Sequence, residues 1–443
     1  MMVQGRQSGA RPARFDMTAL FFVILVAGIG NVVLRPGIGD PFTLYRILAP
    51  LGMLALLVLD TPLTLKALGA YAVFAAYNFA LATAYGGGYS QLLPSLVHYF
   101  YLMIPLVLMI HLKANVRGFD ESYLRFIRGF YIFLLANLVL EFLIGEYYPN
   151  LEVDESEEPG VRAFFWNQND LAVVLCVIGW FYLTLDRFKG FPRALAVVVT
   201  LFLLYYNDSK AALISFCFFS LPIWLIFRIC SAVRIRAFVW ILLCSVVGAI
   251  FIGALVALKD YDIQFAWQRY SIDDLFLQPI MNVLTLEPTG EYLGSLNNRT
   301  DAAIFAIIEY LRTFGFGLGA GGSWLVLTLP QYELGGALSP HNALLQFIVD
   351  FGYPVLLGYL ALTIWALRRL FLHRLTEYEK LKVMAILSFP MLGASQSGAI
   401  VTNFFFFSTV YFIWLLDARP KSPPSAARSL RQQPPLAAVR AQS

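Results

Sequence analysis

His341 is the side chain in this sequence best suited to acid–base chemistry. It lies in Ser-Pro-His-Asn-Ala-Leu (339–344), where a long hydrophilic stretch gives way to an apolar one. Imidazole titrates near neutral pH and is the usual general base of enzymes. The alternative interpretation of this position is a histidine that caps a helix or lies at a membrane interface without a chemical role.

Three cations stand close to junctions between hydrophilic and apolar segments: Arg162, Lys210 and Arg299. Arg and Lys bind phosphate oxygens through charge-assisted hydrogen bonds. The set therefore predicts a site for an anionic group held at a membrane surface. Alternatively, each cation pairs with an acid nearby in the sequence and does nothing else. Those acids are Asp170, Asp208 and Asp301.

Other segments resemble chemical motifs but have simpler explanations. The glycine-rich run 315–323 lacks the strand and the Gly-Lys-Ser/Thr ending of a phosphate loop, so we expect a flexible turn that lets the backbone approach a ligand. The acidic run 152–158 could bind a cation, but a solvated loop is the simpler interpretation. None of the four cysteines has metal-ligand spacing. They are Cys176, Cys217, Cys230 and Cys244.

The composition indicates what kind of fold must position these residues. Of the 443 residues, 59% are hydrophobic and 14% are charged, whereas a soluble domain carries about a quarter charged residues. The net charge of +4 is small, and no basic patch is interleaved with exposed aromatic residues, which excludes nucleic-acid binding. The chain is therefore expected to lie in a lipid bilayer.

The hydropathy pattern predicts an all-α, polytopic protein with about twelve transmembrane helices. Each spanning helix needs about 20 mostly apolar residues. Such runs occur at 17–35, 43–60, 63–84, 91–111, 122–145, 168–186, 191–206, 211–228, 236–258, 345–367, 380–397 and 400–417. The predicted units are 1–258 with nine helices, 259–344 as a large extracytoplasmic loop, 345–417 with three helices, and 418–443 as a disordered cytoplasmic tail.

The distribution of Lys and Arg predicts the orientation. With the N-terminus inside, the predicted cytoplasmic segments hold 24 of the 32 cations, as the positive-inside rule requires. The first apolar run is long and lacks a cleavage site, so we expect a retained span rather than a signal peptide. Both termini are then cytoplasmic. In the long outer loop, residues 302–314 form an amphipathic pattern, which predicts a helix with Thr300 as its N-cap.

Taken in order, these motifs resemble the O-antigen ligase and polymerase superfamily of bacterial envelope glycosyltransferases. The resemblance covers residues 160–365, and its most specific part is the His-Asn pair after a long outer loop. Its features are Arg162 followed by Asn-Gln-Asn-Asp-Leu-Ala (167–172), Asp-Ser-Lys-Ala-Ala (208–212), Asn298-Arg299, the glycine run 315–319, and His341-Asn342 with Asp350 and Gly352. The chain has Ser209-Lys210 where the family commonly has Ser-Arg, and Asp350 where Glu is common.

The resemblance implies a specific reaction. Family members take a glycan from undecaprenyl diphosphate at the outer face of the bacterial inner membrane. They transfer it to a sugar hydroxyl of lipid A–core or of another lipid-linked glycan. No metal and no cofactor are implied, because the lipid diphosphate is itself the leaving group. By this resemblance His341 is the base, with Arg162, Lys210 and Arg299 on the diphosphate. Asn342, Asp350 and Asn169 are auxiliary candidates.

Two other classes of function stay open from the sequence. A transporter or flippase for lipid-linked glycans would show internal repeats and charges near the bilayer midplane. The chain has no visible repeat, but Arg46 and Glu141 fall within apolar runs. A non-catalytic scaffold for envelope assembly would not need His341. The sequence does not separate ligase from polymerase.

The charge distribution generates a topology prediction. Reporter fusions after residues 118, 190, 232 and 376 should report the cytoplasm, and fusions near 155 and 290 should report the outside. A cytoplasmic signal from the fusion at 290 would contradict the proposed site, because it would place His341 on the wrong side of the membrane.

Overall fold

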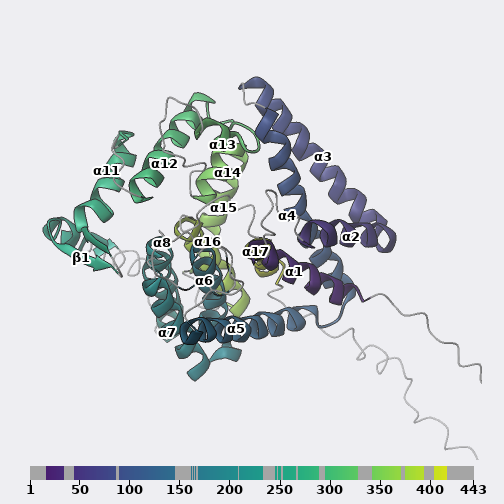
Figure 1. Cartoon of the computed structure of the whole chain (residues 1–443), viewed down its shortest axis with the longest axis horizontal. Coiled ribbons are helices and arrows are strands. Elements are labelled where there is room, and N and C mark those ends of the chain that lie inside the picture. The colour runs from purple at the N-terminus through teal and green to yellow at the C-terminus, as the bar shows by residue number, and fades with distance from the viewer. Residues whose placement is uncertain are drawn as a thin grey trace, which may run out of the picture.

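The computed structural model of the protein is almost entirely helical (Figure 1). It describes residues 16–33, 44–85, 89–144, 161, 163, 165, 168–207, 209–232, 245–246, 248–250, 253–265, 268–288, 295–327, 342–370, 375–393 and 404–416. The all-α prediction is confirmed for these residues, with the addition of one short β-hairpin.

The described residues in the first part of the chain form mostly long helices. These helices are α1 (Met17–Val33), α2 (Leu44–Leu59), α3 (Thr61–Ala84), α4 (Tyr89–Asn115), α5 (Phe119–Ile144), α6 (Gln168–Thr184), α7 (Phe191–Tyr206), α8 (Lys210–Ile214) and α9 (Leu221–Ala232). A 3₁₀ turn, η1 (Asp186–Phe188), links α6 to α7. A π-helical turn, η2 (Ser215–Ser220), joins α8 and α9 into one continuous helix.

The predicted outer loop contains most of the shorter elements. These are the antiparallel hairpin of β1 (Asp262–Phe265) and β2 (Gln268–Ser271), the turn η3 (Asp273–Leu277), and the helices α11 (Gln278–Thr285), α12 (Ser295–Arg312) and α13 (Gly322–Leu327). The chain then returns to the bundle. Its last helices are α14 (Ala343–Phe351), α15 (Tyr353–Leu370), α16 (Glu377–Gly393) and α17 (Phe404–Leu415).

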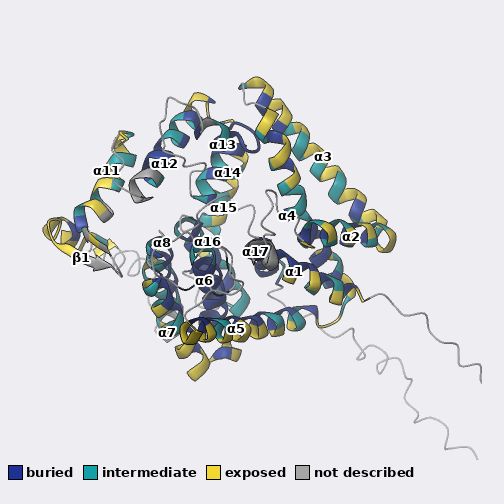
Figure 2. Cartoon of the chain, in the orientation of Figure 1, coloured by how far each residue is buried: buried dark blue, intermediate teal, exposed yellow. Residues whose placement is uncertain are grey.

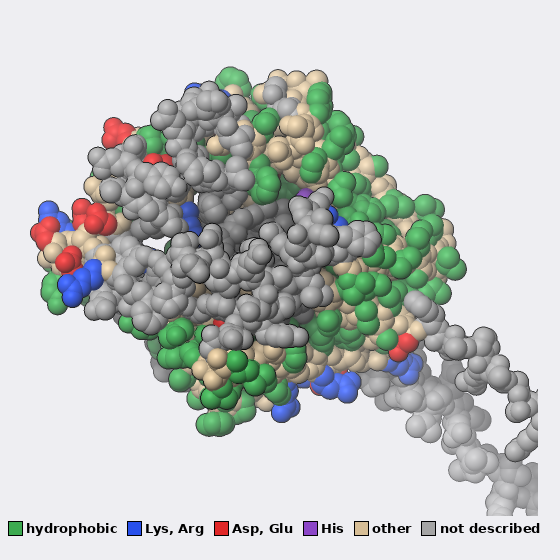
Figure 3. All heavy atoms as spheres, viewed as in Figure 1, with side chains coloured by type: hydrophobic (Ala, Val, Ile, Leu, Met, Phe, Trp, Pro, Cys, Tyr) green, Lys and Arg blue, Asp and Glu red, His purple; other side chains and the backbone are tan. Residues whose placement is uncertain are grey.

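Several helices have the length and exposure expected of membrane spans. Four are long and apolar enough to cross a bilayer: Thr61–Ala84, Tyr89–Asn115, Phe119–Ile144 and Lys210–Ile229. Only 17% of the most apolar window of α3 is buried, and hydrophobic side chains cover the region of α3 and α4 (Figure 3). In contrast, Leu171–Thr184 of α6 is buried throughout, so α6 lies at the centre (Figure 2). The length, composition and exposure of these helices are those of a membrane protein.

Bonds between distant segments gather the predicted cytoplasmic turns on one face. His111 Nδ1 lies 2.9 Å from Asp60 Oδ2, and Arg187 Nη1 lies 2.8 Å from Glu121 Oε2. We call this surface the basic face. It comprises the described residues of 60–66, 111–121, 186–193, 228 and 369–382.

The predicted outer segments gather at the opposite helix ends. The backbone N–H of Ala320 donates to Asn78 Oδ1 at 2.7 Å, and that of Val161 donates to Asn207 Oδ1 at 2.8 Å. We call this surface the loop face. It comprises the described residues of 78–85, 161–165, 207–210 and 315–323. From α3 to α9 the described helices run alternately between the two faces.

The prediction of one continuous span at 345–367 is wrong. The chain forms two helices there, α14 and α15, which are separated at Gly352. Gly352 adopts φ +69°, and a Cβ at this position would lie 2.1 Å from the carbonyl oxygen of Phe316. The break therefore follows from a close approach of two backbone segments, which hydropathy does not reveal.

The predicted start of the amphipathic helix is also wrong. Helix α12 begins at Ser295, so Thr300 lies inside the helix and is not its N-cap. The segment Ser-Leu-Asn-Asn-Arg-Thr-Asp (295–301) has no apolar period that would reveal a helix. The apolar side chains that do recur with helical spacing begin at Ala302.

The glycine-rich run is a turn, but its backbone approaches the protein itself. Gly315, Gly317, Gly319 and Gly321 all have positive φ. A Cβ on Gly317 would lie 2.7 Å from the carbonyl oxygen of Asp350, and one on Gly319 would lie 2.9 Å from that of Asn78. The alternate glycines therefore allow the loop to lie between α14 and the end of α3, close to both backbones.

The carboxylate of Asp350 fastens this loop to α14. It is fully buried, and it accepts the backbone N–H of Gly321 at 3.2 Å and that of Ser323 at 2.9 Å. Two backbone bonds reinforce the contact, from Leu318 N–H to the Val349 carbonyl and from Gly319 N–H to the Asp350 carbonyl. We call Asp350 and residues 315–323 the glycine-loop clamp.

The clamp predicts that Gly352→Ala is destabilising. The positive φ alone costs a non-glycine residue about 1–3 kcal/mol, and the overlap with the Phe316 carbonyl adds to it. The matched control is Gly358→Ala in α15, where a Cβ meets nothing within 4 Å. Thermal unfolding of the purified variants in detergent, followed by tryptophan fluorescence, should show a lower midpoint only for Gly352→Ala. Equal midpoints would contradict the close packing at Gly352.

Candidate functional site

The structure describes some of the predicted site residues directly and others only through their neighbours in the chain. Lys210, Arg299, Asn169, Asn342 and Asp350 are described. The remaining predicted residues, His341, Arg162 and the pairing candidate Asp208, lie outside the described residues. The chain immediately next to each of them is described and shows which elements come together.

The segment on either side of position 162 is fixed by two side chains from neighbouring helices. The amide of Asn207 accepts the N–H of Val161 and donates to its carbonyl, both at 2.8 Å. The carboxylate of Glu141 accepts the N–H of Ala163 at 2.6 Å. Val161, Ala163, Asn207 and Glu141 are all buried. This buried anchorage attaches the segment to the ends of α5 and α7.

Lys210 begins α8 only three residues after Asn207 and is half-buried. The preceding residue, Ser209, is buried and donates from Oγ to Asn169 Oδ1 at 3.4 Å. Asn169 lies in the first turn of α6. The structure thus brings the predicted residues Lys210 and Asn169 into one cluster with the segment that flanks position 162.

Arg299 lies on the inward side of α12. It precedes Ala302 by three residues and Ala306 by seven, and both alanines are buried. Residues this far apart share one face of a helix. Ala306 packs with Leu318 of the glycine loop and Val349 of α14. Burial also lowers the pKa of the Arg299 guanidinium from its ordinary value, but an arginine this basic stays charged at neutral pH.

Asn342, which follows His341 directly in the chain, is the N-cap residue of α14. Its side-chain oxygen caps α14 by accepting the N–H of Leu345 at 3.1 Å, and its amide nitrogen donates to the Pro390 carbonyl at 3.4 Å. Ala343 packs against Gly393 at the end of α16. The position where His341 joins α14 therefore lies against the last turn of α16.

Helix α16 also contacts the helix that begins at Lys210. Ser215 Oγ donates to the Ser388 carbonyl at 3.2 Å, and the Ser220 and Ser388 hydroxyls lie 3.1 Å apart. Ser215 is five residues from Lys210, or about 7 Å along a helix axis. Ser388 is two residues before Pro390, the partner of Asn342. The outer part of α16 thus lies next to both the start of α8 and the start of α14.

Two predicted auxiliary residues have structural roles in this arrangement. The Asn342 amide caps a helix, and the Asp350 carboxylate is occupied by backbone N–H groups of the glycine loop. Asp350 is also fully buried, which makes it a poor substitute for His341 as a base that must meet an acceptor from water. Among the described residues, no group of three or more His, Cys, Asp or Glu side chains could hold a metal ion.

Sequence reasoning missed three polar residues that build the site. Asn207 and Glu141 hold the segment around position 162, and Asn78 accepts the N–H of Ala320 in the glycine loop. Each is a polar side chain at or near the end of an apolar run, which was the available signal. Glu141 was noticed only as a charge that favoured a transporter, and its bond to Ala163 gives it a structural explanation.

Lys210 at the start of α8 and Arg299 on the inward side of α12 are the described cations of the predicted site. Cations that are in place before a reaction stabilise negative charge that develops during it. Asn342, the residue that follows His341 in the chain, caps the start of α14.

Part of the chain matches a known protein family. Residues 195–360 match the family model described as O-antigen ligase. This segment contains Lys210, Arg299, His341 and Asp350, whereas Arg162 precedes it.

A curated relative matches a longer part of the chain. Teichuronic acid biosynthesis protein TuaE of Bacillus subtilis (strain 168) is 29% identical over 283 residues, which are 61% of this chain and 53% of the relative. The aligned part of the chain thus spans about half the length of that protein. Together the two matches support the resemblance of the chain to the O-antigen ligase and polymerase superfamily.

Proposed function

We propose that the protein is a glycosyltransferase of the bacterial inner membrane. It transfers a glycan from a polyprenyl diphosphate, such as undecaprenyl diphosphate, to a sugar hydroxyl at the outer face. The observation that carries the proposal is the convergence on α16 of the helix that begins at Lys210 and the helix that follows His341. The match to the O-antigen ligase family over the same segment supports it. Both termini then lie in the cytoplasm, with the loop face outside.

The proposed reaction is a single displacement at the anomeric carbon. His341 removes the proton from the acceptor hydroxyl, and the acceptor oxygen forms a bond to the anomeric carbon. The bond from that carbon to the phosphate oxygen breaks, and the polyprenyl diphosphate leaves with the electron pair. Lys210, Arg299 and Arg162 stabilise the charge on the leaving diphosphate. Attack from the side opposite the leaving group inverts the anomeric carbon.

The experiment that tests this function is reconstitution with defined substrates. The purified protein is incubated with a lipid-linked oligosaccharide, with and without lipid A–core, and the products are separated by size. The relative is named for teichuronic acid biosynthesis, so lipid A–core is not the only acceptor class to supply. A ladder of longer lipid-linked chains identifies a polymerase, and transfer to core identifies a ligase. No transfer to either acceptor would contradict the proposal.

The cation assignment predicts different effects for two substitutions at one position. Lys210→Ala removes the charge and should lower turnover by about 10²-fold or more, the usual cost of losing a preorganised charge-stabilising group. Lys210→Arg keeps the charge and should retain far more activity. Arg299→Ala should remove activity and weaken binding of the lipid diphosphate. The control is Lys259→Ala, an exposed cation outside the cluster. Wild-type turnover of Lys210→Ala would show that Lys210 is structural.

The base assignment predicts that His341→Ala and His341→Gln are both nearly inactive. A general base contributes about 10²- to 10⁴-fold in rate, and glutamine can form a hydrogen bond but cannot take the proton. Donor binding and membrane insertion should stay normal, because the cations hold the diphosphate. His373→Gln, on the predicted cytoplasmic side, is the matched control. Near-normal turnover of His341→Gln would mean that His341 only positions the acceptor.

A further inference from the structure

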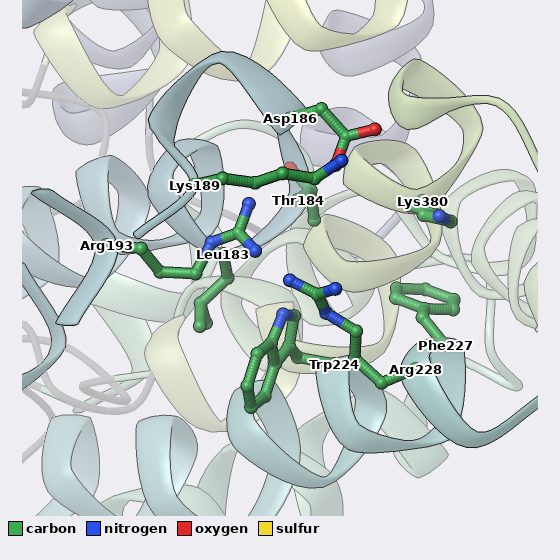
Figure 4. A pocket seen from close by; sticks show the side chains of 9 residues that line it. All are labelled: Leu183, Thr184, Asp186, Lys189, Arg193, Trp224, Phe227, Arg228 and Lys380. Carbon is green, nitrogen blue, oxygen red and sulfur yellow. The ribbon is translucent and has the colours of Figure 1, made fainter. Parts of the chain in front are cut away.

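The basic face contains a hollow that the proposed reaction does not use. It encloses about 180 Å³ between the end of α6, the turn η1 and the helices α7, α9 and α16 (Figure 4). One water molecule takes about 30 Å³ in the liquid, so the hollow has room for several waters or for a phosphate group. It lies at the helix ends opposite the loop face.

The charges that line the hollow are mostly positive. Four cations, Lys189, Arg193, Arg228 and Lys380, face a single lining acid, Asp186. Figure 4 shows the guanidinium groups of Arg193 and Arg228 directed toward the same space. Like charges brought together in a half-enclosed site repel one another, and a bound anion would relieve that repulsion.

The surrounding structure holds two of these cations in place. Arg193 is buried, and its guanidinium donates from Nε to the Tyr182 carbonyl at 2.7 Å and from Nη2 to the Leu185 carbonyl at 2.8 Å. The guanidinium of Arg228 lies over the Trp224 ring, 5.5 Å from its centroid. The geometry is therefore prearranged before any ligand arrives.

The acids at the hollow are fewer than its cations. Asp186 Oδ1 is paired with Lys189 Nζ at 2.7 Å, and this bond lowers the pKa of the Asp186 carboxyl. The nearby Glu377 carboxylate accepts the backbone N–H of Asp186 at 3.0 Å. Asp186 and Glu377 also interact with Arg193 and Lys380, but the four lining cations outnumber these two acids.

We propose that this hollow binds the phosphate of an anionic ligand. The ligand chemistry is a phosphate with at least one negative charge, supplied either by the headgroup of an anionic phospholipid or by free inorganic phosphate. Basic pockets between helix ends on the cytoplasmic side of membrane proteins suit acidic headgroups. Trp224 in the wall and the exposed Leu225 beside it place the hollow next to surface that lipid chains would cover. The proposal does not depend on the glycosyltransferase reaction.

The test compares charge loss inside and outside the hollow. The purified full-length protein in detergent is titrated with phosphatidylglycerol, phosphatidylcholine or inorganic phosphate, and bound ligand is counted by native mass spectrometry. The test variant, which we call variant one, combines Arg228→Gln with Lys380→Gln. The control combines Lys66→Gln with Arg125→Gln, two exposed cations near the same face but outside the hollow. Both variants lose two positive charges.

We expect wild type and control to bind phosphatidylglycerol more tightly than phosphatidylcholine, and variant one to bind it about 30-fold more weakly. If inorganic phosphate binds with the same dependence on Arg228 and Lys380, and the protein binds both lipids equally, the ligand is free phosphate. Equal binding of all ligands by variant one and wild type would overturn the proposal. Equal thermal stability of the two variants shows that any loss is not caused by unfolding.

Discussion

The buried carboxylate of Asp350 is the interaction on which the rest of the loop face depends. A carboxylate inside an apolar bundle is costly unless hydrogen bonds satisfy it. Here the partners are backbone N–H groups of Gly321 and Ser323, which themselves need acceptors because they are buried. The carboxylate needs donors and the N–H groups need an acceptor, and they can meet only if the glycine loop lies directly against α14. That contact accompanies the break at Gly352, where α14 ends.

The proposed chemistry follows from this constraint through a short series of contacts. The glycine loop joins α14 to α12 through Leu318, Val349 and Ala306, which places the inward face that carries Arg299. The other end of α14 is capped by Asn342 and rests on α16. Helix α16 in turn bonds to Ser215 in the helix that Lys210 begins. Contacts among described neighbouring residues thus bring these distant parts of the chain together.

Hydropathy and charge predicted the parts of the fold that depend on transfer between water and lipid. Most of the described apolar runs are helical, because helix formation in an apolar run depends on the sum of many residues. The break at Gly352 and the start of α12 at Ser295 were not predictable in this way. Each depends on a contact with a segment that is distant in the sequence, and a single sequence does not show which distant segments are in contact.

The candidate site was predictable as residue types but not as an arrangement. Histidine and the cations at junctions indicated the chemistry, and two matches to known proteins support that class. Asp350 and Asn342, which the sequence predicts as auxiliary groups, form hydrogen bonds with the backbone that the sequence does not reveal. The sequence also does not reveal Asn207, whose amide pairs with both backbone groups of Val161. A polar residue near the end of a span can have a chemical or a structural role, and only its hydrogen-bond partners distinguish the two roles.

The most direct measurement of the central claim is photo-cross-linking with a polyprenyl-diphosphate glycan that carries a diazirine next to the diphosphate. The labelled peptides of the purified protein would be identified by mass spectrometry. Because the helix that begins at Lys210 and helix α14 both contact α16, we expect labelling near Lys210 and near the start of α14. An excess of unlabelled donor should reduce this labelling. Labelling confined to the lipid-facing surface of α3, or to the basic face, would contradict it.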